Sequence, residues 1–230
     1  MSAEVSAPSH AEPARRVGRP RAFEDADVFA AIRAVLIRDG FHELTLMAVA
    51  NELDVSTPAL ARRFGDKHEM LQAFMQATDT MVEKFCAELA LRYESPLDSL
   101  RARWKIPIRN VPMEYDGKEG VLAWVEFLLC IRTDPSYGAQ LEQRTRVWID
   151  GVAKQLRAAY AAGEIVETDF DMLAHVLSSA MTGAMLFWFE HRRGDLYQEI
   201  GGIFEFILAP YKVAEKSLIS SNGQRMAAGC

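Results

Sequence analysis

The stretch from residue 45 to residue 67, TLMAVANELDVSTPALARRFGDK, constrains the fold of this chain more than any other. From Leu46 onward its apolar residues are spaced at i, i+3, i+4 and i+7, which is typical of one face of an amphipathic helix. Thr45 stands before this face as an N-cap, and Asp54 follows it, where a tight turn needs a residue that tolerates a left-handed backbone. A second short helix follows with Pro58 in its first turn, where the missing N–H removes no hydrogen bond. The sequence therefore predicts two short helices joined by a tight turn.

Two short helices joined in this way are typical of a helix-turn-helix, whose second helix enters the major groove of DNA. Ala50 is small where the two helices must touch, and Leu60 faces inward from the second helix. The outward face of that helix carries Thr57, Ala61 and Arg62. A helical hairpin that only packs against the rest of the chain has the same spacing, so that alternative stays open on these residues alone.

The overall charge does not indicate a nucleic-acid binder. The net charge is −6 at pH 7, and residues 1–70 contain nine Lys and Arg against eleven Asp and Glu. DNA binding would therefore depend on where individual charges lie and not on their sum. Half of the 230 residues are apolar, so the chain is long enough to bury a sizeable core.

The first 22 residues are rich in Ala, Pro, Ser and Arg, which predicts a disordered arm. Residues 15–21 have the sequence RRVGRPR, so Arg19 and Arg21 lie in a group of four positive charges that contains no acid. Arms of this kind reach phosphates or the narrow minor groove of A/T-rich DNA. A basic tail that stays in solvent is the alternative.

From residue 23 the apolar spacing is helical almost without a break. Asp66 and Glu69 have the spacing of a capping box at the start of the helix after the pair. The spacing predicts further helices over residues 24–39, 66–93, 95–104, 121–131, 135–163, 172–189 and 195–210, with a mobile connection over 105–120. The prediction is an all-α fold of about nine helices, divided into a helix-turn-helix domain (23–67), a helical ligand-binding and dimerisation domain (68–213) and a disordered tail (214–230).

The predicted elements follow one another in a fixed order: a first helix, Gly-Phe at residues 40–41, a Thr-capped second helix, Val55-Ser56, a recognition helix ending at Phe64, and Asp66-Lys67 before a long helix. In this order and spacing the chain resembles the TetR family of bacterial transcriptional regulators. The basic Gly18-Arg19-Pro20 arm fits as well. The specific similarity spans roughly residues 18–75, and later parts match only in architecture.

The resemblance implies that Thr45 and Lys67 contact phosphates and that the outward residues of the recognition helix read bases or backbone. Ala61 stands where the family usually has Tyr, and Asp54 where it usually has Gly. Without the Tyr, we expect Arg62 and Arg63 to carry more of the recognition, because arginine binds guanine bidentately for ~1 to 3 kcal/mol of discrimination. Either arginine could instead anchor a phosphate or stay solvated. The predicted DNA-binding residues are Arg19, Arg21, Thr45, Ser56, Thr57, Pro58, Ala61, Arg62, Arg63 and Lys67.

The resemblance also implies a homodimer that binds a palindromic double-stranded DNA operator, with half-sites ~34 to 36 Å apart. Repression is the family's usual mode. A small-molecule inducer in the C-terminal domain would move the recognition helices out of register with the DNA, with the helix over residues 66–93 as the lever. Bulky side chains favour an apolar or aromatic inducer, although each of them taken singly is more typical of plain core. The predicted ligand-binding residues are Met81, Phe85, Trp104, Trp124, Phe127, Trp148, Met181 and Met185.

The last two predicted helices carry the predicted dimer interface. Small residues in the first of them permit close approach by another helix, and the second has one apolar stripe. Two such helices from each subunit would form an intersubunit four-helix bundle. The alternative is that the same stripe closes the chain's own core. The predicted interface residues are Ser178, Ser179, Gly183, Ile200, Ile203, Phe204, Ile207, Leu208 and Tyr211.

Other classes of protein are less compatible with the sequence. It contains no GxSxG, HExxH or Gly-rich phosphate loop, and its five His and three Cys lack metal-ligand spacing, so we expect no enzyme, cofactor or metal site. Residues 172–189 carry no formal charge, but polar side chains interrupt them and favour a buried helix over a membrane span. The scattered Cys and the lack of an apolar leader predict a cytoplasmic protein. A helical adaptor that binds a protein partner through the helix-turn-helix face stays as the alternative function.

Overall fold

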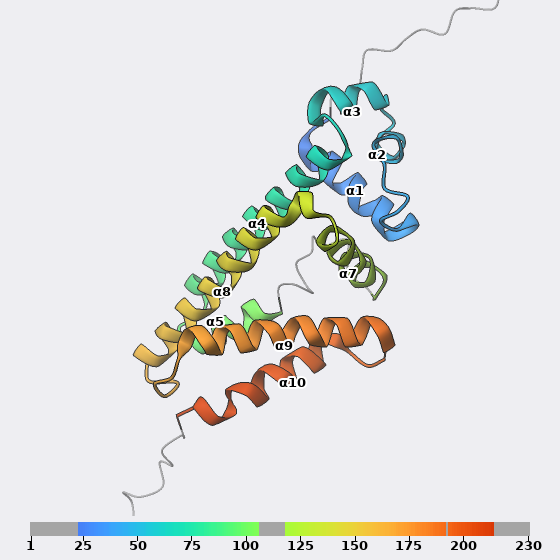
Figure 1. Ribbon diagram of the computed structural model, residues 1–230. Coiled ribbons are helices and arrows are strands. Elements are labelled where there is room, and N and C mark those ends of the chain that lie inside the picture. The colour runs from blue at the N-terminus through green and yellow to red at the C-terminus, as the bar shows by residue number, and fades with distance from the viewer. Residues whose placement is uncertain (1–22, 106–117, 192, 214–230) are drawn as a thin grey trace, which may run out of the picture.

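The computed structural model describes residues 23–105, 118–191 and 193–213, which form an all-α fold (Figure 1). Within these ranges the chain has nine α-helices, the number that the sequence predicted. The predicted arm and tail, and residues 106–117 of the predicted connection, lie outside the described residues. The helices are α1 (Asp25–Asp39), α2 (Leu46–Glu52), α3 (Thr57–Phe64), α4 (Lys67–Arg92), α5 (Pro96–Trp104), α7 (Lys118–Arg132), α8 (Gly138–Ala161), α9 (Phe170–His191) and α10 (Leu196–Leu208), with 3-10 turns at Pro135–Tyr137 and Ala209–Tyr211.

The turn between α2 and α3 forms as the sequence predicted. The hydroxyl of Thr45 accepts a hydrogen bond from the amide of Ala48 at 3.0 Å and caps α2. Asp54 has φ +55°, the one non-glycine residue in the left-handed region among those described. The amide of Val55 then donates to the carbonyl of Ala50 at 3.0 Å, which closes the turn and sets the angle between the two helices.

The junction between α3 and α4 depends on a glycine and a capping box. Gly65 has φ +83°, and a Cβ there would lie 1.6 Å from Oε2 of Glu69. That carboxylate accepts from the amide of Asp66 at 3.1 Å, and the Asp66 carboxylate accepts from the amide of Glu69 at 2.9 Å. The predicted capping box is therefore confirmed, and it fixes the start of the long helix against the end of α3.

Two large buried clusters and a small one at Cys86 and Leu89 form the interior of the described chain, and α7 contributes to both large ones. One cluster joins α1, α2, α3 and the start of α4, and it includes Trp124, Phe127 and Ile131 of α7. The other joins α5, α8, α9 and α10, and it includes Val121 and Val125 of α7. The all-round apolar character of α7 in the sequence thus reflects burial on two faces by two different cores.

Helix α9 is long and apolar enough to cross a bilayer by length and composition alone, and no other described helix is. Nearly half of its apolar window is buried within the chain. It lies between α8 and α10, and Leu173, Leu177 and Trp188 belong to the C-terminal core. These contacts are those of the core helix that the sequence predicted.

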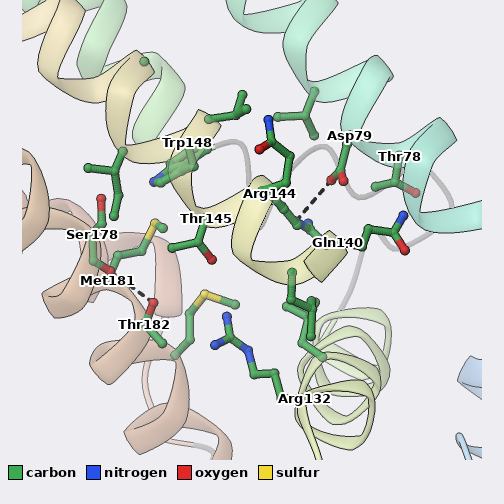
Figure 2. Close-up of a pocket in the computed structure, with 18 of the residues that line it drawn as sticks. Thr78, Asp79, Arg132, Gln140, Arg144, Thr145, Trp148, Ser178, Met181 and Thr182 are labelled. Atoms are coloured by element: carbon green, nitrogen blue, oxygen red, sulfur yellow. Dashed lines mark hydrogen bonds and ion pairs between the residues drawn. The ribbon is translucent and has the colours of Figure 1, made fainter. Parts of the chain in front are cut away.

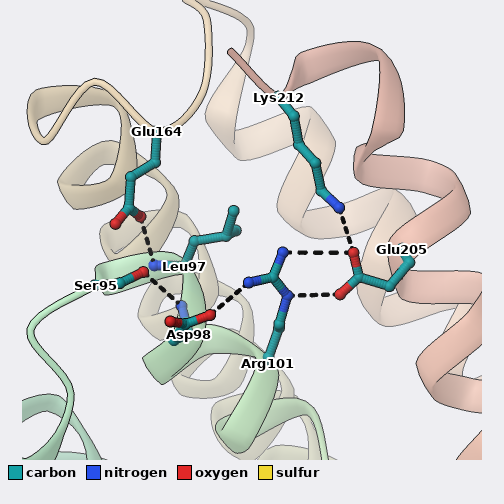
Figure 3. A network of polar contacts seen from close by, with 7 residues as sticks. All are labelled: Ser95, Leu97, Asp98, Arg101, Glu164, Glu205 and Lys212. Atoms are coloured by element: carbon teal, nitrogen blue, oxygen red, sulfur yellow. Dashed lines mark hydrogen bonds and ion pairs between the residues drawn. The ribbon is translucent and has the colours of Figure 1, made fainter. Parts of the chain in front are cut away.

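A network of polar contacts joins α5 to α10 and Lys212 (Figure 3). Arg101 donates to the carboxylate of Glu205 on α10 at 2.6 Å and to Asp98 at 2.5 Å, while Lys212 forms a second ion pair with Glu205. Partial burial acts to raise the pKa of Glu205, but the hydrogen bonds from Arg101 and Lys212 outweigh it and lower that pKa overall. The network therefore holds α10 against α5.

We expect Glu205→Gln to lower the free energy of unfolding at pH 7 by about 0.5 kcal/mol, because both ion pairs are partly exposed and screened by solvent. The folded-state pKa of Glu205 is lowered, so this contribution is present above the ordinary pKa of Glu and is lost as the pH falls through the folded value. Urea unfolding of both proteins at about pH 7 and about pH 3.5 measures it. An equal difference at both pH values would contradict the ion pairing.

Candidate DNA-binding face and ligand cavity

Helix α3 lies at one extremity of the molecule, with α1 and α2 beside it (Figure 1). Leu60 is fully buried on its inner face, whereas Ser56, Pro58 and Arg62 are exposed on its outer side. Thr57 and Ala61 are half-buried between the two sides. Arg19 and Arg21, the predicted arm contacts, lie outside the described residues.

The two arginines of α3 differ in their surroundings. Arg63 pairs with Asp25 of α1 at 2.6 Å, and its guanidinium lies 5.9 Å from the ring centres of Phe23 and Phe64. Arg62 projects from the exposed face, and no carboxylate among the described residues pairs with it. The positive charge that α3 offers to a partner is therefore that of Arg62, while Arg63 is held against α1.

Lys67, the first residue of α4, is half-buried, and its ammonium lies 4.6 Å from the centre of the Phe41 ring. Burial lowers the pKa of Lys67, although the ammonium stays close to the molecular surface. Thr45 is exposed at the start of α2. Because its hydroxyl oxygen accepts the capping bond, its own hydrogen is available to a phosphate oxygen.

A cavity of about 610 Å³ lies between α4, α5, α7, α8 and α9 (Figure 2), and no residue of α3 lines it. It is of the size that drug-sized ligands occupy in proteins. Of the eight predicted ligand-binding residues, four line it: Trp124, Trp148, Met181 and Met185.

The other four predicted ligand-binding residues do not line this cavity. Phe127 is fully buried in the N-terminal core, and Trp104 is buried in the C-terminal core against Phe204. Phe85 packs on a small cluster at Cys86 and Leu89, and Met81 is partly exposed on α4. Helical spacing predicted that these side chains were apolar contacts, but it could not say which buried surface each of them joins.

Polar side chains also line the cavity, and sequence reasoning missed them. Arg144 of α8 pairs with Asp79 of α4 at 3.1 Å, and its guanidinium lies 5.4 Å from the ring of Trp124 (Figure 2). Burial raises the pKa of Asp79 even though Arg144 acts in the opposite direction. Arg103, at the end of α5, is only 8% exposed. In the sequence both arginines look like ordinary surface charges on helices, because the residues that bury them lie far away along the chain.

The wall of the cavity is continuous with the core of the helix-turn-helix unit. Trp124, which lines the cavity, stacks on Phe127 with ring centres 5.3 Å apart. Phe127 in turn contacts Phe41 at 6.0 Å and Phe74 at 5.8 Å. Phe41 is also the ring that Lys67 covers. A chain of aromatic contacts therefore runs from the cavity through α7 to the start of α4.

The predicted dimer residues divide into two groups. Ile200, Phe204 and Leu208 are buried in the chain's own core, and Ser178 is buried at the cavity, so these four are not accessible to a second subunit and the prediction is corrected there. Ser179 is exposed, whereas Gly183, Ile203, Ile207 and Tyr211 are half-buried. Phe187 and Phe206, which the prediction omitted, are 62% and 82% exposed on α9 and α10.

Comparison with known proteins agrees with this geometry. Residues 28–74, from α1 into α4, match the family described as bacterial regulatory proteins, tetR family. A comparison with curated protein sequences finds no match.

Solved structures with the same fold come from several organisms. A TetR transcription regulator from Haloarcula marismortui ATCC 43049 is 13% identical, with a TM-score of 0.71, over 82% of this chain and 98% of that chain. A transcriptional regulator from Saccharomonospora viridis in complex with choline is 14% identical, with a TM-score of 0.70, over 82% and 97%. SmeT, the repressor of the Stenotrophomonas maltophilia multidrug efflux pump SmeDEF, is 19% identical, with a TM-score of 0.67, over 84% and 92%.

These structures share the two-part helical fold over 82–84% of this chain. The matched segment contains most of α1, all of α2 and α3, and the turn between them. Residues 28–74 therefore form a DNA-binding domain of the tetR family type, and the chain as a whole has the fold of TetR-family transcriptional regulators.

Proposed function

We propose that this protein is a ligand-responsive repressor, with no catalytic role, that binds a palindromic operator as a homodimer and is released by a small apolar or aromatic inducer. The observation that carries the proposal is the position of α7, which lines the cavity with Trp124 and enters the core of the helix-turn-helix unit with Phe127. Trp124 stacks on Phe127, and Phe41 and Phe74 pack on Phe127 in turn. A molecule that displaces Trp124 would therefore also displace Phe127. SmeT, of the same fold, is a repressor, which supports this mode of regulation.

Control then works through the geometry of the two recognition helices. Two copies of α3 must reach successive major grooves, so a small change in the angle of α4 is enough to lose the fit. For the inducer to weaken operator binding 100-fold, the coupling between cavity and operator needs to be only ~2.7 kcal/mol. We infer that α4 and α7 move together, because the N-terminal core packs the start of α4 against α7.

The homodimer is supported by apolar side chains that remain exposed in the single chain. Met172, Val176 and Phe187 lie along one face of α9, at spacings that place Ser179 and Gly183 between them, and Phe206 projects from α10. Small residues flanked by large apolar ones allow two helices to approach closely. We therefore assign the interface to this face of α9 with Phe206, and not to the buried stripe of α10.

A helical adaptor that binds protein through α3 is the competing function, and the acidic balance of the sequence favours it. The salt dependence of binding distinguishes the two functions. In a plot of log affinity for DNA against log salt concentration, each phosphate contact contributes about −0.9 to the slope. Selection of bound fragments from the source genome by the purified protein supplies the operator. Failure to enrich any sequence with a folded, dimeric protein would favour the adaptor.

On the selected operator, Arg62→Ala should lower affinity by about 10- to 100-fold and relax the preference for one base pair in each half-site, because a bidentate contact with guanine is lost. Arg92→Ala is the matched control, since it removes one exposed arginine at the far end of α4. Fluorescence anisotropy with operator variants measures both effects. Equal losses for the two variants would remove Arg62 from the readout.

Lys67→Ala should weaken binding to all sequences alike and reduce the salt slope by about 0.9, because one phosphate contact is removed. Lys84→Ala is its control, since Lys84 is exposed on α4 several turns from the DNA end. Titrations at a series of salt concentrations give the slope. If Lys67→Ala leaves the slope unchanged, the ammonium serves only to pack on Phe41.

Phe206→Ser combined with Phe187→Ser should shift the protein from dimer to monomer and reduce operator affinity, because both rings would leave the subunit interface. Leu91→Ser is the control, since Leu91 is an equally exposed apolar residue on α4. Sedimentation velocity over a concentration series measures the dimer. A dimer that survives the double change but dissociates with Leu91→Ser would locate the interface on the opposite side.

A further inference from the structure

Arg103 is a buried arginine whose charge no described residue balances. It is 8% exposed, and one guanidinium nitrogen donates to the main-chain carbonyl of Trp148 at 3.2 Å. Its Nε has no hydrogen-bond partner among the described residues, and none of their carboxylates forms an ion pair with it. Cys86 is the titratable group that acts on the charge of Arg103, and burial raises the pKa of Cys86, so that thiol stays neutral at pH 7. A buried charge without a partner is unfavourable unless a ligand supplies one.

The chain makes room for this guanidinium at some expense in helix stability. Gly151 lies in the interior of α8, and a Cβ there would stand 2.4 Å from a terminal nitrogen of Arg103. Glycine in a helix interior is less favourable than alanine. Beside it, Trp148 covers the guanidinium, with the ring centre 4.7 Å away. Gly151 and Trp148 thus place Arg103 against α8, where its charge neutralises no carboxylate of the described chain.

The remaining polar groups of the cavity also offer more donors than acceptors. Buried N–H groups of Arg103, Arg144 and Trp148 lack partners among the described residues, against one amide oxygen, that of Gln140. The hydroxyl of Ser178 can act in either sense. Such a lining suits a molecule that brings acceptors and negative charge.

The charged side chains that line the cavity also favour a negatively charged ligand. Arg103, Arg132 and Arg144 line it, and so do Asp79 and Glu83. Asp79 is already paired with Arg144, and Glu83 is exposed on α4. We propose that the cavity binds an organic anion, with its carboxylate on the guanidinium of Arg103 and its apolar body among Trp148, Met181 and Met185. The regulatory meaning of this site rests on the proposed function, whereas the binding itself does not.

Calorimetric titration of the full-length protein tests the inference with a matched pair of molecules, 2-naphthoate and its neutral counterpart 2-naphthamide. We expect the carboxylate to bind about tenfold more tightly than the amide, because a charge-assisted hydrogen bond is roughly twice as strong as a neutral one. Octanoate, a flexible carboxylate, serves as a second anion. Equal affinity for naphthoate and naphthamide, or no binding of either carboxylate at millimolar concentration, would overturn the anion site.

Variants assign the binding to Arg103. Arg103→Met should remove the preference for naphthoate over naphthamide and leave the Tm of the ligand-free protein unchanged or higher, because a buried unpaired charge has gone. Arg146→Met is the control, since Arg146 lies on the exposed side of α8 and pairs with Glu142. A lower Tm with the preference intact would mean that Arg103 is structural and would overturn the assignment. Should Arg103→Met fail to fold, Arg103→Lys keeps the charge and should retain part of the preference.

Operator affinity, measured in the same samples, separates this inference from the proposed function. Naphthoate binding that depends on Arg103 without any change in operator affinity would support the anion site and count against ligand control. Release of the operator by naphthamide as readily as by naphthoate would support ligand control and overturn the anion site.

Discussion

Helix α7 is packed between two cores, which cover different faces of it. Val121 and Val125 belong to the C-terminal core, while Phe127 and Ile131 belong to the core of the helix-turn-helix unit. The recognition helix is therefore not carried by an independent small domain. Its support includes aromatic rings, Phe41 and Phe74, that pack on a helix whose other side lines a cavity. Packed interiors resist continuous deformation, so a change on one side of α7 tends to produce a discrete rearrangement on the other.

The distribution of charge reconciles an acidic chain with a DNA-binding fold. Arg38 and Arg63 are paired with acids of α1 and α2, so part of the acidic excess is matched locally. Arg62 and Arg103 lack such a partner among the described residues, one on the exposed face of α3 and the other in the cavity. The proposed operator would bring hydrogen-bond acceptors to the first of these guanidinium groups, and the proposed anion would bring them to the second.

Local features of the fold could be predicted from the sequence because their causes lie within a few residues of each other. The cap at Thr45, the left-handed turn at Asp54 and the capping box of Asp66 with Glu69 all follow from short-range rules. The surface that covers an apolar stripe could not be predicted in this way. Helical spacing identifies the stripe of α10 that holds Phe204, but both a partner subunit and the chain's own α5 can cover such a stripe. The pairing of Arg103 with α8 lies beyond any local rule, since the two segments are brought together only by the tertiary fold.

The contact between Arg103 and Gly151 has a consequence for sequence variation within the family. Any side chain at position 151 would occupy the space of the guanidinium, so the two positions cannot vary independently. In homologues that share this arrangement of α5 and α8, arginine at position 103 should occur together with glycine at position 151, and a larger residue at 151 should accompany a small or apolar one at 103. The presence or absence of the pair would then sort such homologues by the charge of the molecules they sense.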